Sequence, residues 1–253
     1  MRSIDLNADL GEGFGRWELT DDEALLALVT SANVACGFHA GDPGTMRRTC
    51  AAAAGRGVAI GAHVGYRDLV GFGRRPMRVP GPELADEITY QIAALDGFAR
   101  LAGSRVSYVK PHGALYNTVA VDAEQAGALA EAVRRYDKEL AVVGLAGSEG
   151  LRIAAEHGLS TVAEAFADRA YTKHGTLVPR WEDGSVLHDP REIVERCVRM
   201  LREGRVIAAD GTVLEFAAQT VCVHGDTPGA VEIARTLREG LLEAGIELKS
   251  FIG

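Results

Sequence analysis

The chain has 253 residues, of which 47% are hydrophobic and 25% are charged, and its formal net charge is −8. These values are typical of a globular protein with a sizeable core, and the length suits one barrel-sized domain over residues 1–253. The acidic balance argues against a nucleic-acid partner or an anionic membrane surface, because both require a broad basic surface.

Short apolar segments alternate with segments that carry helix caps or an amphipathic pattern, which predicts alternating strands and helices. The first strand begins at Ile4, and the other six are predicted at 31–37, 58–62, 105–109, 140–145, 161–165 and 220–223. The helices are predicted at 24–29, 43–54, 82–101, 123–136, 148–157, from 190 onward and at 229–244. The predicted helix starts are a capping box from Thr20 to Glu23, then Asp42, Asp122, Ser148, Asp189 and Thr227 with Pro228.

Three further segments interrupt this alternation. Long loops rich in glycine or arginine are predicted between residues 64 and 81 and between 172 and 188, and loops of this length are usually functional. The segment 206–216 has Asp210 and Gly211 between two arms rich in β-forming residues. This pattern predicts a hairpin outside the main fold.

The N-terminal sequence and the cysteines both argue against secretion. The first residues, MRSIDLNADL, lack a basic segment followed by a long apolar region, and nowhere do 18 apolar residues run together. The four cysteines are scattered without a C-x-x-C pair, which is typical of reduced thiols rather than of a disulfide or zinc framework. We therefore expect a cytoplasmic protein.

Strands that are apolar throughout and joined by helices form parallel sheets, which leaves two architectures. An open doubly wound sheet binds its ligand only where the strand order reverses, whereas a closed barrel brings every strand end to one face. Functional-looking side chains follow six of the seven strands: Asp9, His39, His63, Lys110 with His112, Asp168, and His224 with Asp226. Because only a barrel gathers all six, we predict an α/β fold of the TIM-like type, a seven-stranded (β/α) barrel.

The first strand ends in polar residues among glycines, in IDLNADLGEGFG at 4–15. Asn7, Asp9 and Glu12 lie where apolar residues give way to a turn that lets backbone approach a ligand. Alone, this pattern fits an ordinary polar turn equally well. Its recurrence at five other strand ends favours a shared catalytic rim.

Four of the seven histidines, at positions 39, 63, 112 and 224, lie just beyond strands. With Asp9 they could bind zinc, manganese or iron, or they could act as general acids and bases without a metal. No H-x-x-x-H or H-E-x-x-H spacing decides between these alternatives, so a divalent metal is left open.

Cationic side chains are expected near the same rim. Lys110 is fixed between a strand and a proline, as a partner for an oxyanion or a phosphate. Arg74, Arg75, Arg169 and Arg180 lie on the two long loops, where they could bind a carboxylate or a phosphate. No G-x-x-x-x-G-K-[ST] occurs, and no G-x-G-x-x-G follows a strand and opens a helix. A nucleotide would therefore bind by another route or belong to a partner protein.

Long motifs cover essentially the whole chain. They are DLNADLGEGFG at 5–15, SANVACGFHAGDP at 31–43, GAHVGYRDLVGFGRR at 61–75, VKPHGALYN at 109–117, EAFADRAY at 164–171 and VCVHGDTP at 221–228. In this order they resemble the lactam-utilisation family that is associated with the A subunit of bacterial ATP-dependent (ATP-hydrolysing) 5-oxoprolinase. Val64 stands where that family usually has proline, a departure that leaves His63 in place.

The resemblance implies a TIM-like barrel similar to those of glycoside hydrolases and polysaccharide deacetylases. It also implies conversion of 5-oxo-L-proline, ATP and water into L-glutamate, ADP and phosphate, together with partner subunits B and C. ATP would then be a co-substrate that a partner subunit could bind. Two other classes stay open: a stand-alone metal-dependent deacetylase or amidohydrolase, and a non-catalytic subunit that completes a partner's site.

The strand-end residues take expected roles in opening a lactam. Asp9 with His39 or His63 would activate water, while Lys110 and His112 would stabilise the developing oxyanion or the leaving phosphate. The expected substrate-binding residues are Asn7, Glu12, Arg74, Arg75, Asp168, Arg169 and His224.

Overall fold

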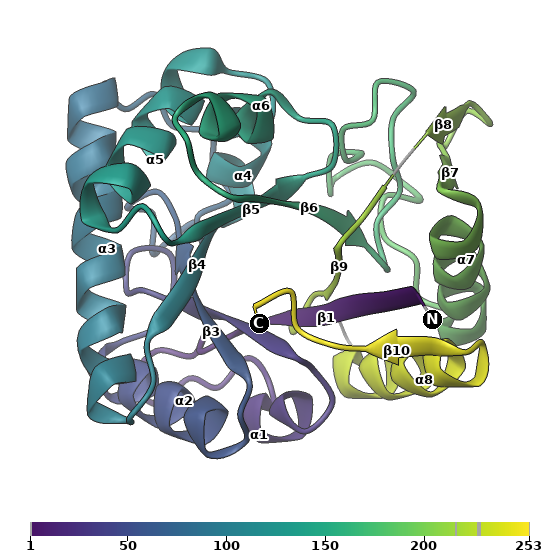
Figure 1. Ribbon diagram of the computed structural model, residues 1–253, viewed down its shortest axis with the longest axis horizontal. Coiled ribbons are helices and arrows are strands. Elements are labelled where there is room, and N and C mark those ends of the chain that lie inside the picture. The colour runs from purple at the N-terminus through teal and green to yellow at the C-terminus, as the bar shows by residue number, and fades with distance from the viewer. Residues whose placement is uncertain (1, 216, 227–228, 253) are drawn as a thin grey trace.

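The computed structural model describes residues 2–215, 217–226 and 229–252, and Figure 1 shows them as a ring of strands with helices around it. Seven parallel strands form the ring: β1 (Arg2–Leu10), β2 (Ser31–Ala35), β3 (Ala59–Val64), β4 (Val106–Pro111), β5 (Ala141–Leu145), β6 (Thr161–Phe166) and β9 (Thr220–Val223). Asp5 of β1 pairs with Thr220 of β9, and this pairing closes the barrel. The predicted seven-stranded barrel is confirmed.

Helices pack on the outside of the ring (Figure 1). Those within the described residues are α1 (Asp22–Leu26), α2 (Pro43–Gly55), α3 (Gly81–Leu101), α4 (Gly113–Val119), α5 (Ala123–Tyr136), α6 (Glu149–Glu156), α7 (Pro190–Glu203) and α8 (Ala230–Glu243). Their apolar faces and the outward side chains of the strands, such as Leu6, Val34 and Ile60, form one buried core. In the part of the chain that the structure describes, no helix combines the length and apolar character needed to cross a membrane.

Aspartate side chains start several of these helices. Asp42 and Asp189 cap α2 and α7 as predicted: Asp42 accepts hydrogen bonds from the backbone N–H groups of Gly44 and Thr45, and Asp189 accepts one from that of Arg191. The capping box predicted at Thr20 is wrong. Asp21 caps α1 instead, since its side chain accepts a hydrogen bond of 3.0 Å from the backbone N–H of Ala24.

Two elements lie where the sequence predicted none, namely helix α4 and strand β10 (Ile246–Leu248). At the predicted hairpin, β7 (Arg205–Ile207) and β8 (Val213–Glu215) pair as an antiparallel ribbon. The helix start predicted at Thr227 and Pro228 lies outside the described residues.

The C-terminal segment covers the N-terminal end of the barrel. Strand β10 pairs in parallel with the first residues of β1, beside which Figure 1 shows it, and the backbone N–H of Lys249 just beyond β10 donates to the carbonyl of Ile4 at 3.0 Å. Beyond β10, the ring of Phe251 contacts that of Tyr108 edge to face, with 5.1 Å between the centroids. Ile252 packs into the same cluster, beside Val143 and Val162. This small apolar cluster, separate from the main core, forms the floor of the barrel.

Polar side chains fill the barrel interior, where such barrels usually carry branched apolar residues. The alternating inward residues of β1 are Asp5, Asn7 and Asp9. The amide of Asn7 donates to Glu164 at 3.0 Å and accepts from Asn33 at 2.7 Å. The hydroxyl of Tyr108 in turn donates to Asn33 at 2.7 Å. Hydrogen bonds between side chains of different strands therefore hold the interior together.

Replacement of Gly61 by alanine should destabilise the barrel. The ring of Tyr108 lies directly over Gly61, where a methyl group would overlap it. The ring has little freedom to move, because its hydroxyl is bound to Asn33. We expect Gly61→Ala to lower the free energy of unfolding by about 1–3 kcal/mol, measured by urea denaturation.

Gly97 supplies the matched control for this substitution. It lies on the exposed face of α3 with open space around its Cα. Gly97→Ala should leave the free energy of unfolding unchanged or raise it by up to about 1 kcal/mol. Equal stability of the two variants would contradict the tight fit between Gly61 and Tyr108.

Candidate active site

A cavity of about 770 Å³ opens at the carboxyl ends of the barrel strands. It is within the size range of small-molecule sites. The predicted site residues that line it are Asp9, His63, Arg74, Lys110, His112, Arg169 and His224. The predicted site residues outside its wall are Asn7, Glu12, His39, Arg75 and Asp168.

The buried ammonium of Lys110 lies at the base of this cavity. It is 3.1 Å from Asp9 Oδ1 and 2.8 Å from Glu164 Oε1, and it also donates to Asn7 Oδ1 at 3.3 Å. Burial alone would lower the pKa of Lys110, but the negative charges of Asp9 and Glu164 outweigh it and raise the pKa well above its ordinary value. Lys110 is therefore a fixed positive charge.

Asp9 presents one carboxylate oxygen to the barrel and the other to the histidines. Its Oδ1 accepts from Lys110 and, at 2.9 Å, from the amide of Asn33. Its Oδ2 lies 3.4 Å from His63 Nε2. Burial raises the pKa of Asp9, but the nearby His63 and Lys110 lower it by more. The pKa of Asp9 is therefore well below its ordinary value. Asp9 is therefore an ionised carboxylate.

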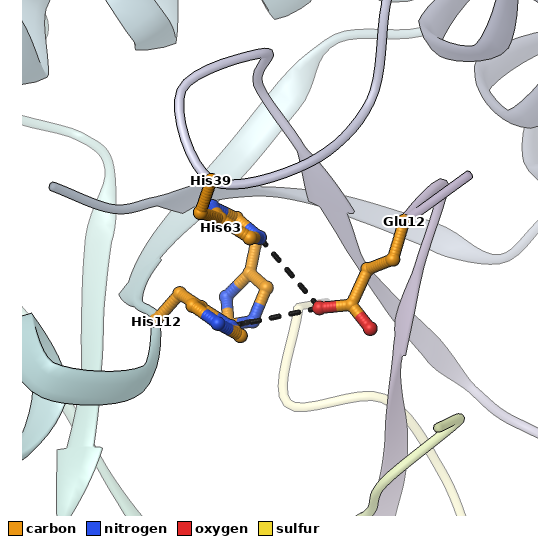
Figure 2. Close-up of side chains that lie close together, drawn as sticks. All are labelled: Glu12, His39, His63 and His112. Carbon is orange, nitrogen blue, oxygen red and sulfur yellow. Dashed lines mark hydrogen bonds and ion pairs between the residues drawn. The ribbon is translucent and has the colours of Figure 1, made fainter. Parts of the chain in front are cut away.

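Three imidazoles and one carboxylate form a buried cluster beside the cavity, and Figure 2 shows them around one point: Glu12, His39, His63 and His112. One ligand atom from each lies within 4.8 Å of all the others, so the set could hold a metal ion. Asp9, Cys222 and His224 form a second such set. Burial lowers the pKa of His39 and of His112 and raises that of Glu12, which disfavours the charged form of each.

Close approach of the β3–α3 loop confines this cluster, called here the histidine cluster. A Cβ on Gly65 would lie 2.7 Å from His39 Nδ1, and one on Gly73 would lie 2.7 Å from the Cβ of His39. Gly73 also adopts a φ of +63°, which a side chain would strain. The glycines of the long predicted loop thus let its backbone pack directly on the imidazoles.

An aspartate–histidine pair forms another wall of the cavity. His224 Nδ1 lies 2.9 Å and 3.1 Å from the two carboxylate oxygens of Asp168. The His224 ring stacks on Phe166, with 5.1 Å between the ring centroids. Because the carboxylate fixes the orientation of the ring, Nδ1 is the nitrogen that carries a proton.

The arginines divide between the cavity and the outer surface. Arg74 lines the cavity and pairs with Asp226 at 2.7 Å. Arg169 also lines it, and burial together with nearby Arg180 lowers the pKa of Arg169 to about 10. Arg75 instead pairs with Asp68, and 64% of its side chain is exposed. Neighbouring arginines in the sequence therefore face different surroundings.

One charged residue of the site, Glu164, was not among the predicted ones, whereas Arg180 was predicted as a possible partner for an anion. Glu164 binds Lys110 from β6, and its sequence signal was a carboxylate inside the apolar run VAEAF. Arg180 was expected on a long loop and lines the cavity beside exposed Trp181. Asn33 carries no such signal, because a polar residue in SANVACG fits a strand end equally well.

The sequence is similar to those of curated proteins along its whole length. The A subunit of a 5-oxoprolinase from Streptomyces avermitilis is 63% identical over 248 residues, which cover 98% of this chain and 99% of that protein. The corresponding 5-oxoprolinase protein from Mycolicibacterium gilvum, also named as the A subunit, is 59% identical over 251 residues, which cover 99% of this chain and 100% of that protein.

Solved structures are also similar to this chain over nearly its whole length. A lactam utilization protein from Thermus thermophilus superposes with a TM-score of 0.93 at 44% identity, covering 98% of this chain and 100% of that one. A putative cellobiose-phosphate cleavage protein from Enterococcus faecalis shares the fold alone, with a TM-score of 0.56 at 12% identity over 98% of this chain and 97% of that one. The model of the LamB/YcsF family matches residues 4–253. The chain belongs to the LamB/YcsF family.

Proposed function

We propose that this chain is the A subunit of an ATP-dependent 5-oxoprolinase, which opens the lactam ring of 5-oxo-L-proline to give L-glutamate with hydrolysis of ATP to ADP and phosphate. The names of relatives 63% and 59% identical support this assignment. The observation that carries it is one cavity that gathers a buried cation, an ionised carboxylate and an aspartate-oriented histidine.

Ring opening makes defined demands on such a site. A water molecule must attack the carbonyl carbon, the C–N bond must break, and the departing nitrogen must receive a proton. A lactam carbonyl is a poor electrophile, and phosphoryl transfer from ATP to its oxygen makes the carbon more reactive. The phosphoryl group then leaves as phosphate in a further hydrolytic step. The site must therefore orient water, move a proton and stabilise negative charge on oxygen.

The cavity residues meet these demands in the proposal. Asp9 Oδ2 accepts a hydrogen bond from the attacking water and orients it, because Lys110 and Asn33 hold Oδ1. His224, oriented by Asp168, carries the proton from water to the departing nitrogen. The positive charge of Lys110 stabilises the oxyanion. Arginine side chains in the cavity wall bind the carboxylate of 5-oxoproline in this proposal.

Arg74 and Arg169 are the proposed partners of that carboxylate, since both line the cavity whereas Arg75 does not. His63 lines the cavity but His39 does not, which supports assigning the substrate contact to His63 rather than to His39. ATP is the proposed co-substrate. Because the sequence lacks a phosphate-binding loop, we propose that partner subunits B and C supply its site.

Reconstitution tests the function directly. Glutamate formation from 5-oxoproline and ATP is measured with the purified chain alone and with subunits B and C added. We expect turnover only in the complete mixture. Glutamate release by the chain alone would favour a stand-alone amidohydrolase, and no release by the complete mixture would contradict the proposal.

Asp9→Asn should lower kcat of the reconstituted complex by about 10² or more, because the amide cannot serve as the anionic acceptor for water. The matched control is Asp5→Asn, the same change at a buried inward residue of the same strand that lies outside the cavity wall. Near-ultraviolet circular dichroism checks that both variants are folded. Equal kcat for the two variants would remove Asp9 from the mechanism.

Arg74→Ala and Arg75→Ala should separate the two adjacent arginines. Loss of a charge-assisted contact with the substrate carboxylate should raise KM for 5-oxoproline about tenfold or more in Arg74→Ala. Arg75→Ala should leave KM within about twofold, since its side chain is not part of the cavity wall and pairs with Asp68. Steady-state kinetics at saturating ATP give both values. A KM that rises equally in both variants would contradict the assignment.

A further inference from the structure

The histidine cluster contains buried polar atoms with no hydrogen-bond partner: Glu12 Oε1, His39 Nδ1 and His39 Nε2. Side chains of the cluster are at most 4% exposed, so bulk water does not solvate these atoms. Each unsatisfied buried polar group costs about 1–3 kcal/mol. A cluster of this kind persists where a ligand satisfies it.

Hydrogen bonds from His63 and His112 to backbone carbonyls determine which nitrogen of each ring carries the proton and which faces the centre of the cluster. His63 Nδ1 lies 3.1 Å from the carbonyl oxygen of Lys110, and His112 Nε2 lies 2.9 Å from that of Phe72. A carbonyl only accepts, so each of these nitrogens carries the proton. His63 Nε2 and His112 Nδ1 are then unprotonated in the neutral rings, yet they face each other at 3.0 Å. Two lone pairs at this distance repel unless a cation lies between them.

The other two members converge on the same point. Glu12 Oε1 lies 3.5 Å from His112 Nδ1 and 3.6 Å from His39 Nε2 (Figure 2). Ligands about 2.0–2.1 Å from a tetrahedral ion are about 3.3–3.4 Å apart, close to this spacing. A proton shared by two nitrogens would satisfy only that pair, whereas one metal ion would satisfy all four residues once the His39 ring has turned. We propose that Glu12, His39, His63 and His112 bind one divalent transition-metal ion of the zinc class.

The surroundings match those of metal-binding histidines. Such residues usually donate their second ring nitrogen to a backbone carbonyl, as His63 and His112 do here. Phe72, whose carbonyl holds His112, has a φ of +53°, the only positive φ at a non-glycine residue among those the structure describes. Strained backbone of this kind is held in place at functional sites. The loop therefore bears strain to fix the direction of His112.

One ring must turn to complete the site. The His39 and His112 rings are parallel within 5°, with 3.8 Å between centroids, so an ion in the plane of the His112 ring lies out of the plane of the His39 ring. His39 has no hydrogen bond on either nitrogen, so a turn of its ring about the Cβ–Cγ bond breaks none, although the backbone packed on the ring at Gly65 must shift with it. His63 and His112 line the cavity, so the ion would face the substrate side. Bound there, it would supply a Lewis acid.

Metal binding is tested on the isolated chain, without 5-oxoproline or ATP, so its outcome is independent of the proposed function. The chelator-treated protein is titrated with Zn²⁺ and with Co²⁺. We expect one equivalent of Zn²⁺ by elemental analysis, a Tm that rises with added Zn²⁺, and the visible absorption of tetrahedral Co²⁺.

Two ligand variants and one control complete the test. Glu12→Gln and His112→Asn should weaken Zn²⁺ binding about tenfold or more, with near-ultraviolet circular dichroism reporting that they are folded. His174→Ala removes an exposed histidine outside the cluster and should bind Zn²⁺ as the unmodified chain does. No uptake by the unmodified chain, or equal affinity in Glu12→Gln and His174→Ala, overturns the proposal.

Discussion

The buried ammonium of Lys110 constrains the rest of this barrel. It comes from β4 and contacts carboxylates on β1 and β6, so one charge links three strands across the interior. Desolvation can cancel the attraction of a buried ion pair, so this network is weak evidence for stability. It does specify register. A slip of one residue in any of the three strands would turn a charged side chain out into the apolar layer under the helices. The same network ionises Asp9 and thereby defines the base of the cavity.

Around the base of the cavity, different loops position different histidines. The β3–α3 loop packs its glycine backbone on the imidazoles and places a carbonyl against His112. The segment after β6 supplies Asp168, which orients His224 from the other side. The two proposals therefore assign proton transfer and ion binding to separate histidines, although all of them follow barrel strands. Under this assignment four histidines share one rim without duplicating one another.

Much of this arrangement could be predicted from the sequence, because the carboxyl ends of the strands in a parallel barrel lie on one face irrespective of the loop conformations. The apolar strands, the caps at Asp42 and Asp189, and the residues Asp9, Lys110 and His224 follow from local pattern. The local pattern does not predict which of two adjacent residues in a loop faces the cavity. Arg74 and Arg75 differ through the path of a loop, and His39 lies outside the cavity wall although it follows a strand just as the wall residue His112 does. Strand β10 is too short to stand out from a loop, and its pairing with β1 depends on contacts between distant parts of the chain.

The pairing of β1 with β9 and β10 also has a consequence for synthesis. Besides its neighbour β2, strand β1 pairs with β9 and β10, which lie more than 200 residues further along the chain and are therefore made much later. Contacts so distant in sequence make folding slow, because the intervening loop must be ordered before they form. We expect the nascent chain to hold an open sheet with β1 as an unprotected edge until the C-terminal segment emerges. Truncation before β9 would then trap an unclosed and aggregation-prone barrel, because β9 supplies the strand that closes the ring onto β1.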